Sequence, residues 1–278
     1  MPAATRDNER RLSAMTHLTL LQRLGAGERQ MTLGVRMCHT ADISRMAHGA
    51  GFSAVWVDLE HSSMPLQCAV DIAISATDLG LEGWVRTPER DLGVIGRLLD
   101  GGVSGIIAPR IETVEEARDV VLAARLPPRG HRSQIGRLPQ MHFRRLPGRE
   151  LNELENQRTV VQILLESRRG IEHAEEIASI DGVDVIALGL NDLAADLGCI
   201  GDINHPEVTD ACRHVAAAAH KHGKLAVVGG VAEISHYEKL FRLGFAPLVF
   251  AGIDTDLLAT GLAQRVTDWR SSAGKATP

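Results

Sequence analysis

The chain has 278 residues, of which 44% are hydrophobic and 3% aromatic, and its formal net charge is −5. An acidic balance with few aromatic side chains argues against nucleic-acid and anionic-membrane partners, which require basic or base-stacking surfaces. No apolar run is long enough to span a bilayer, and the four cysteines show no C-x-x-C spacing. We therefore expect a cytoplasmic protein whose cysteines are reduced.

The first residues are charged and contain no apolar signal-peptide core. We expect residues 1–15 to form a flexible extension and residues 16–278 to form a single domain, since no change of composition marks a second one.

Short apolar runs alternate along the chain with segments of helical periodicity. In chain order, we expect helix 17–27, strand 32–36, helix 40–50, strand 54–58, helix 65–77, strand 82–86, helix 91–99, strand 104–108 and helix 113–124. An irregular segment, from 127 to about 150, precedes strand 160–165, helix 171–180, strand 184–188, helix 206–222, strand 225–228, helix 231–243, strand 247–251 and helix 254–269. Asp254 is expected to be the N-cap of the last helix.

The predicted strands are nearly continuous runs of Val, Ile, Leu and Ala, which is typical of strands buried on both faces. Eight β-α units in about 250 residues favour an α/β fold of the (β/α)8 (TIM) barrel type. An open doubly wound sheet is the alternative, but it usually has fewer strands, and no G-x-G-x-x-G motif follows an early strand.

The segment 160–192 contains one β-α-β unit, and each of its strands is followed by an acid, Glu166 or Asp192. Parallel strands joined by a right-handed crossover have their carboxyl ends on the same side of the sheet, so these two carboxylates can converge. Hard oxygen ligands of this kind suit Mg²⁺ or Mn²⁺. The alternative is a pair of solvated loop acids.

Other reactive residues follow further strands, at the end of the barrel where active sites lie. Strand 54–58 is followed closely by Glu60 and His61, and strand 82–86 ends at Arg86. Arg86 offers donors to a carboxylate or an enolate oxygen, and the imidazole of His61 can transfer protons. Asp58 lies three residues before His61 and is predicted to orient its ring. Together these residues suit proton or carbon–carbon chemistry beside a carbonyl group.

The order of these motifs resembles the HpcH/HpaI family of class II, metal-dependent pyruvate aldolases. The resemblance runs from about residue 20 to about residue 265, which is nearly the whole chain. The matching segments read GFSAVWVDLEHSS (51–63), WVRTP (84–88), LLDGGVSGIIAPRIETVEEA (98–117), PPRG (127–130), ESRRG (166–170), GVDVIALGLNDLAADLG (182–198) and GIDTDLL (252–258). The family fold is a modified (β/α)8 barrel whose last helix is exchanged between neighbouring subunits.

The resemblance implies a set of roles. Glu166 and Asp192 would bind Mg²⁺, Mn²⁺ or Co²⁺. Arg86 would bind pyruvate and stabilise its enolate, and His61 with Asp58 would act on the substrate hydroxyl. The backbone of Gly189, Leu190 and Asn191 would contact the pyruvate carboxylate, and Asp100 would reach a neighbouring subunit's site. The family assembles as hexamers, which are trimers of dimers.

The sequence also departs from the family pattern. Leu164 stands where the family has a glutamine that orients the substrate, and Gln162 lies two residues earlier on the same strand face. The family's G-P-x-D-L-S is G-L-N-D-L-A here, with Leu190 and Ala194 as the changed residues. These departures leave the identity of the aldehyde and of the 2-oxo acid open.

We therefore predict a lyase that reversibly cleaves a 4-hydroxy-2-oxo acid into pyruvate, hydroxypyruvate or oxaloacetate and an aldehyde. No predicted strand ends in a lysine, which favours a metal route over a Schiff base. Two alternatives remain at this stage. One is a lyase acting on acyl-CoA esters of the malyl or citramalyl type, and the other is a non-catalytic barrel that binds small 2-oxo acids.

Overall fold

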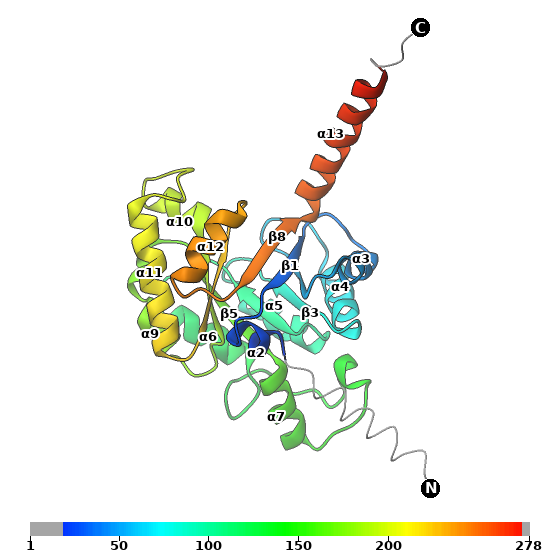
Figure 1. Cartoon of the computed structure of the whole chain (residues 1–278). Helices are drawn as coiled ribbons and strands as arrows, with labels where there is room; N and C mark the ends of the chain where they lie inside the picture. Colours follow the sequence, from blue (N-terminus) through cyan, green and yellow to red (C-terminus); the bar gives the residue numbers. More distant parts are fainter. Residues whose placement is uncertain (1–18, 274–278) are drawn as a thin grey trace.

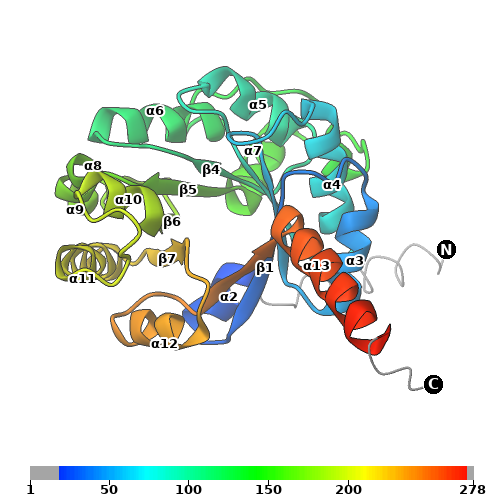
Figure 2. The ribbon, with the colours of Figure 1, turned by 90° about the horizontal axis from the view of Figure 1, so that it is seen from above.

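A computed structural model describes residues 19–273 of the chain. The predicted extension 1–15 and the start of the first predicted helix lie outside the described residues. Within the described part, eight parallel strands form a nearly closed barrel ringed by helices, which confirms the predicted (β/α)8 fold (Figure 1, Figure 2).

The strands are β1 (Gln30–Val35), β2 (Ala54–Asp58), β3 (Glu82–Arg86), β4 (Gly105–Ala108), β5 (Val160–Leu165), β6 (Val185–Gly189), β7 (Leu225–Gly229) and β8 (Leu248–Ile253). Each strand from β1 to β7 pairs in parallel with the next, and β8 pairs with β1. The seam lies between β7 and β8, where the Ala246 N–H donates to the Ala226 carbonyl at 2.7 Å.

The helices before and within the barrel are α2 (Leu20–Gly25), α3 (Asp42–Ala50), α4 (Leu66–Asp78), α5 (Leu92–Asp100), α6 (Val114–Ala124), the 3-10 turn η1 (Pro139–Met141) and α7 (Gly148–Arg158). They are followed by α8 (Arg168–Glu172), α9 (Ala174–Ala178), α10 (Leu190–Asp196), α11 (Pro206–Lys221), α12 (Ile234–Arg242) and α13 (Asp254–Ala273). Among residues 19–273, no helix combines the length and apolar character needed to cross a bilayer.

Alternate residues of each strand face two separate apolar clusters, as the period of two requires. Val55, Val57 and Val85 join the larger cluster between strands and surrounding helices. Trp56 and Trp84 face inward and pack in the smaller cluster inside the barrel, which α2 closes with its buried leucines at the amino end of the strands. At the carboxyl ends of the strands, the residues that share the inward direction of Trp56 and Trp84 therefore point into the mouth of the barrel.

Two helices were not predicted from the sequence. Helix α7 begins inside the segment that was expected to be irregular, because its buried face carries Glu155 and Asn156 beside Leu151 and so lacks an apolar stripe. The side chain of Asn156 holds the backbone of Leu126 through two hydrogen bonds, of 2.8 and 2.9 Å. Helix α10 was missed because it follows β6 directly and has only seven residues.

Helix α13 projects away from the barrel instead of packing along its wall (Figure 1, Figure 2). Its large apolar side chains are exposed by about half or more, including Leu258 at 50%, Leu262 at 60% and Trp269 at 64%. Asp254 is the first residue of α13 rather than its N-cap, so that expectation was wrong. Its carboxylate instead accepts the backbone N–H groups of Arg36, Met37 and Cys38.

Gly83 in β3 marks the closest approach between the sheet and helix α4. A Cβ atom at this position would lie 2.1 Å from the carbonyl oxygen of Ala73. We expect Gly83→Ala to lower the free energy of unfolding by roughly 1–3 kcal/mol, because strand and helix must separate. Urea denaturation measures the change, and Gly96→Ala is the matched control since no atom lies within 4 Å of its added Cβ. Equal stability of the two variants would contradict this packing.

Candidate active site

The carboxyl ends of β1, β2 and β3 carry a buried ion cluster centred on Asp58, whose side chain is 0% exposed. Arg86 donates to both oxygens of Asp58, from Nε at 2.9 Å and from Nη2 at 2.6 Å. Arg36, at the end of β1, donates to Asp58 Oδ2 from Nε at 2.6 Å. Burial alone would raise the pKa of Asp58, but the hydrogen bonds and charges of the two arginines outweigh it and lower the pKa.

The predicted contact between Asp58 and the His61 ring is wrong. Asp58 Oδ1 accepts the backbone N–H groups of Glu60 and His61, and both of its oxygens are taken by arginines. The His61 ring lies beside Glu60 instead, with Nε2 at 3.7 Å from Glu60 Oε2. The His61 side chain is 45% exposed and therefore accessible to a ligand in the barrel mouth.

Glu60 links this cluster to the ends of β4, β5 and β6. Arg86 Nη1 lies 2.9 Å from Glu60 Oε2, and Arg110 Nε lies 3.3 Å from Glu60 Oε1. Arg110 in turn donates its backbone N–H to Glu166 Oε2 at 3.3 Å, and its Nη2 lies 3.7 Å from Asp192 Oδ1. The structure thus brings Arg86, Glu166 and Asp192 to one rim, as the strand ends predicted.

Glu166 directly follows β5, and its side chain is largely buried. It is 7% exposed, and burial raises its pKa to about 7, with the charges of Glu60 and Asp192 adding to the rise and Arg86 opposing it. A carboxylate destabilised by neighbouring acids is stabilised by a proton or by a cation, and its oxygen donors suit a divalent ion.

Within residues 19–273, no three acids, histidines or cysteines are arranged as a complete metal site. Two carboxylates are nevertheless sufficient for Mg²⁺, which commonly takes one or two from the protein and its other ligands from substrate and water. The donor set of Glu166 and Asp192 therefore fits a divalent ion.

The remaining predicted residues lie at different depths. Leu190 and Asn191 open helix α10 at the same rim. Gln162 lies below Leu164 on the inward face of β5, 1% exposed, and neither of its amide atoms has a partner among the described residues. Asp100 is not part of this rim, because it ends α5 at the opposite end of the barrel and pairs with Arg132 at 2.7 Å.

Sequence reasoning missed Arg36 and Arg110. Arg36 ends the predicted strand 32–36, and its place in the site depends on the contact with Asp58 of the next strand, which the sequence does not reveal. Arg110 follows β4 with a left-handed backbone, at φ +53°, which sequence periodicity does not reveal. Trp56 was also missed as a support of the site, although its ring lies 5.3 Å from the guanidinium carbon of Arg86.

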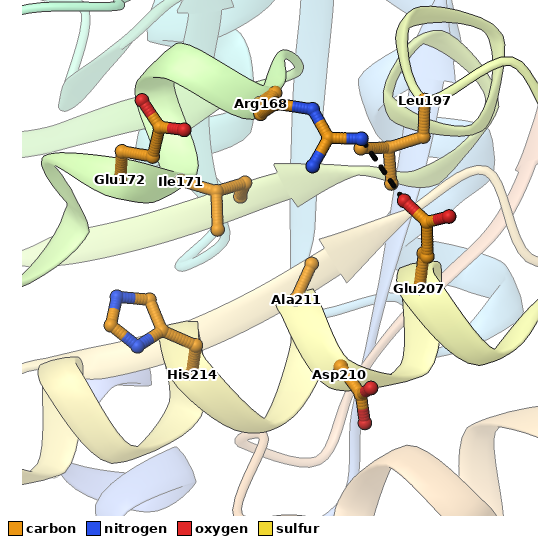
Figure 3. Close-up of a pocket in the computed structure, with 8 residues that line it drawn as sticks. All are labelled: Arg168, Ile171, Glu172, Leu197, Glu207, Asp210, Ala211 and His214. Atoms are coloured by element: carbon orange, nitrogen blue, oxygen red, sulfur yellow. Dashed lines mark hydrogen bonds and ion pairs between the residues drawn. The ribbon is translucent and has the colours of Figure 1, made fainter.

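A separate groove of about 430 Å³ lies outside the barrel between α8 and α11 (Figure 3). Arg168 points across it to Glu207 at 3.0 Å, and Ile171, Leu197 and Ala211 supply its apolar lining. It includes none of the predicted site residues.

Comparison with known proteins adds to this geometry. The family model described as HpcH/HpaI aldolase/citrate lyase matches residues 37–260. The chain belongs to the HpcH/HpaI family. It is an enzyme, a class II aldolase, as the sequence resemblance predicted.

Three proteins illustrate the similarity. The 4-hydroxy-4-methyl-2-oxoglutarate aldolase of Hapsidospora irregularis is 34% identical over 248 residues, which are 87% of this chain and 91% of that protein. The hydroxypyruvate/pyruvate aldolase of Roseovarius nubinhibens is 31% identical, over 80% of this chain and 85% of that one. The crystal structure of the HpcH/HpaI aldolase from Desulfitobacterium hafniense superposes with a TM-score of 0.83 at 27% identity, covering 94% and 98% of the two chains.

The raised pKa of Glu166 predicts how stability depends on pH without a divalent ion. Its pKa is about 7 in the folded protein and near 4.5 when unfolded, so the folded state holds the extra proton between these values. Stability therefore falls as pH rises from about 4.5 to 7, by about 3 kcal/mol in total. We expect Mg²⁺ or Mn²⁺ to raise Tm more at pH 8 than at pH 5.5, as measured by calorimetry. A metal effect equal at both pH values, or one retained in Glu166→Gln, would contradict the assignment.

Gly189 leaves room for the Glu166 side chain, since a Cβ atom at this position would lie 2.5 Å from Glu166 Oε1. We expect Gly189→Ala to displace that carboxylate and weaken Mn²⁺ binding at least tenfold by titration calorimetry. Gly229→Ala is the matched control, because Gly229 pairs with Gly189 in register and has no atom within 4 Å of an added Cβ. Unchanged Mn²⁺ affinity in Gly189→Ala would show that Glu166 is not a ligand.

Proposed function

We propose that the enzyme reversibly cleaves the C3–C4 bond of a 4-hydroxy-2-oxo acid, giving an aldehyde and pyruvate or a close analogue such as hydroxypyruvate or oxaloacetate. The observation that carries the proposal is the convergence of Glu166, Asp192 and Arg86 at one rim of the barrel. Names of relatives support the same class, since two of them are aldolases of a 4-hydroxy-2-oxo acid and of pyruvate or hydroxypyruvate.

Glu166 and Asp192 would hold the divalent ion, Mg²⁺, Mn²⁺ or Co²⁺. Bound there, the ion would act as a Lewis acid on the 2-oxo group and favour the enolate. The buried position of Glu166 supports this role, because removing water from a charged centre strengthens its electrostatic effect.

Arg86 would bind the C2 oxygen and stabilise the negative charge that develops on it. Its Nε and Nη2 are fixed by Asp58, and the Trp56 ring lies against its guanidinium group. The Nη1 group, 2.9 Å from Glu60, is then the donor that faces the carboxylate cluster. A guanidinium fixed on two sides costs little reorganisation when charge appears on the substrate.

His61 would remove the proton from the C4 hydroxyl group. As that proton leaves, the C3–C4 bond breaks, its electron pair forms the C2–C3 double bond, and the C2 oxygen becomes an enolate while the aldehyde departs. A proton delivered to C3 then yields pyruvate. The half-exposed ring beside Glu60 suits this exchange of protons.

The backbone N–H groups at the start of α10, in the segment Gly189–Asn191, would receive the substrate carboxylate, because the first amides of a helix have no partner within it. Gln162 would approach the substrate from below, through the amide atoms left without partners in the described residues.

The enzyme would assemble through α13, as a hexamer built from three dimers. The exposed Leu258, Leu262 and Val266 recur every four residues and form one stripe with Trp269, which packing on a neighbouring subunit would bury. Asp100 would then serve a neighbour's site, since it lies far from the mouth of its own barrel and is partly exposed.

The alternatives from the sequence have less support. A CoA-ester lyase has less support because the relatives with at least 30% identity named above are aldolases. A localisation in the cytoplasm remains an expectation from composition.

Enolate formation can be measured without knowing the aldehyde. We expect the metal-loaded enzyme to exchange the methyl protons of pyruvate in D₂O, as followed by proton NMR with Mg²⁺. Arg86→Ala and Glu166→Ala should each slow the exchange at least 100-fold, because each removes a charge that stabilises the enolate. Arg168→Ala, in the outer groove, is the control and should exchange normally. Exchange that persists in Glu166→Ala would exclude this metal site.

A further inference from the structure

Arg36 lies in the mouth of the barrel although no role has been assigned to it. Arg36 directly follows β1. Leu33 and Val35 point outward into the larger cluster between strands and helices, so Gly34 and Arg36, at the alternate positions, face the inside of the barrel. Val35 pairs with Val57, and Asp58 pairs with Arg86. Arg36, Asp58 and Arg86 therefore form one row across three neighbouring strand ends.

The two arginines of this row differ in their ionic partners. Asp58 is a single carboxylate that accepts hydrogen bonds from two guanidinium groups. Arg86 has a second acid, Glu60, at 2.9 Å, whereas Arg36 shows no other ion pair within residues 19–273. Its interaction with Asp58 uses Nε, so both Nη groups are available to a ligand. The side chain is 30% exposed.

The backbone under Arg36 is fixed. The buried carboxylate of Asp254 accepts the N–H groups of Arg36 at 2.9 Å, Met37 at 3.0 Å and Cys38 at 2.7 Å. Asp254 thus fixes the backbone of Arg36, and Asp58 fixes its Nε group. The two Nη groups are therefore held in a defined position.

Arg110 is the other unassigned cation on the rim, but its charge is already engaged. Its guanidinium lies 3.3 Å from Glu60, 3.7 Å from Asp192 and 3.9 Å from Glu89. A substrate anion would meet a carboxylate cluster there, whereas at Arg36 it would meet Nη groups that make no hydrogen bond within residues 19–273.

We propose that Arg36 binds a carboxylate at the far end of the substrate, so that the preferred substrates are 4-hydroxy-2-oxo dicarboxylates and the released carbonyl compound carries the second carboxylate. This inference rests on the proposed function, with the 2-oxo end bound by Arg86. Two strand spacings separate the residues, about 10 Å between backbones, and both side chains lean toward Asp58, which suits a short dicarboxylate spanning them.

The test compares two substrates that differ at one group, 4-hydroxy-2-oxoglutarate and 4-hydroxy-2-oxopentanoate, in which a methyl group replaces the distal carboxylate. We expect the Mg²⁺-loaded wild-type enzyme to have the higher kcat/KM for the dicarboxylate. In Arg36→Met the ratio of the two kcat/KM values should fall at least tenfold, because a charge-assisted pair is lost. Arg36→Gln should lower the ratio by the same factor. Because glutamine retains a hydrogen-bond donor for Asp58, this variant shows that the effect does not come from a folding defect.

Arg45→Met is the matched control, since Arg45 is exposed on α3 and pairs with Asp42; its ratio should equal that of the wild type. An unchanged ratio in folded Arg36→Gln would overturn the inference, as would a fall in Arg110→Met instead. Pyruvate proton exchange, measured on each protein, separates the two proposals: its absence in the wild type refutes the proposed function, whereas normal exchange with an unchanged ratio refutes only the role of Arg36.

Discussion

The buried carboxylate of Asp58 is the interaction on which the rest of the barrel mouth depends. It is fully buried, yet it stays ionised because two guanidinium groups and two backbone amides satisfy its oxygens. Removing one partner from such a group leaves an uncompensated charge, which is strongly destabilising. By fixing Arg36 and Arg86 on either side, Asp58 joins the ends of three strands into one rigid wall that presents two guanidinium groups.

The acids beside this wall, Glu60, Glu166 and Asp192, share Arg86 and Arg110 as their described cationic neighbours. Glu166 lies among Glu60 and Asp192, and its raised pKa reflects both burial and these neighbours. The barrel topology brings the wall and these acids together, because parallel strands place all their carboxyl ends at one rim. A small 2-oxo acid between them would meet donors on one side and a divalent ion on the other, which is the environment that stabilises an enolate.

Much of this arrangement could be predicted from the sequence. Near-continuous apolar runs gave all eight strands, and the strand ends led to Arg86, Glu166 and Asp192. The partner of the His61 ring could not be derived, because three-residue spacing after a strand does not fix side-chain direction. Helix α7 escaped because its buried face is polar, and the role of Asp254 in holding residues 36–38 depends on a contact across 218 positions.

A crystal structure of the enzyme with Mn²⁺ and pyruvate would test the central claim most directly. The account predicts an anomalous peak bonded to carboxylate oxygens of Glu166 and Asp192, with the pyruvate 2-oxo group near Nη1 of Arg86 and the Asp58–Arg86 pair intact. Mn²⁺ bound elsewhere, or pyruvate held without contact to Arg86, would contradict it.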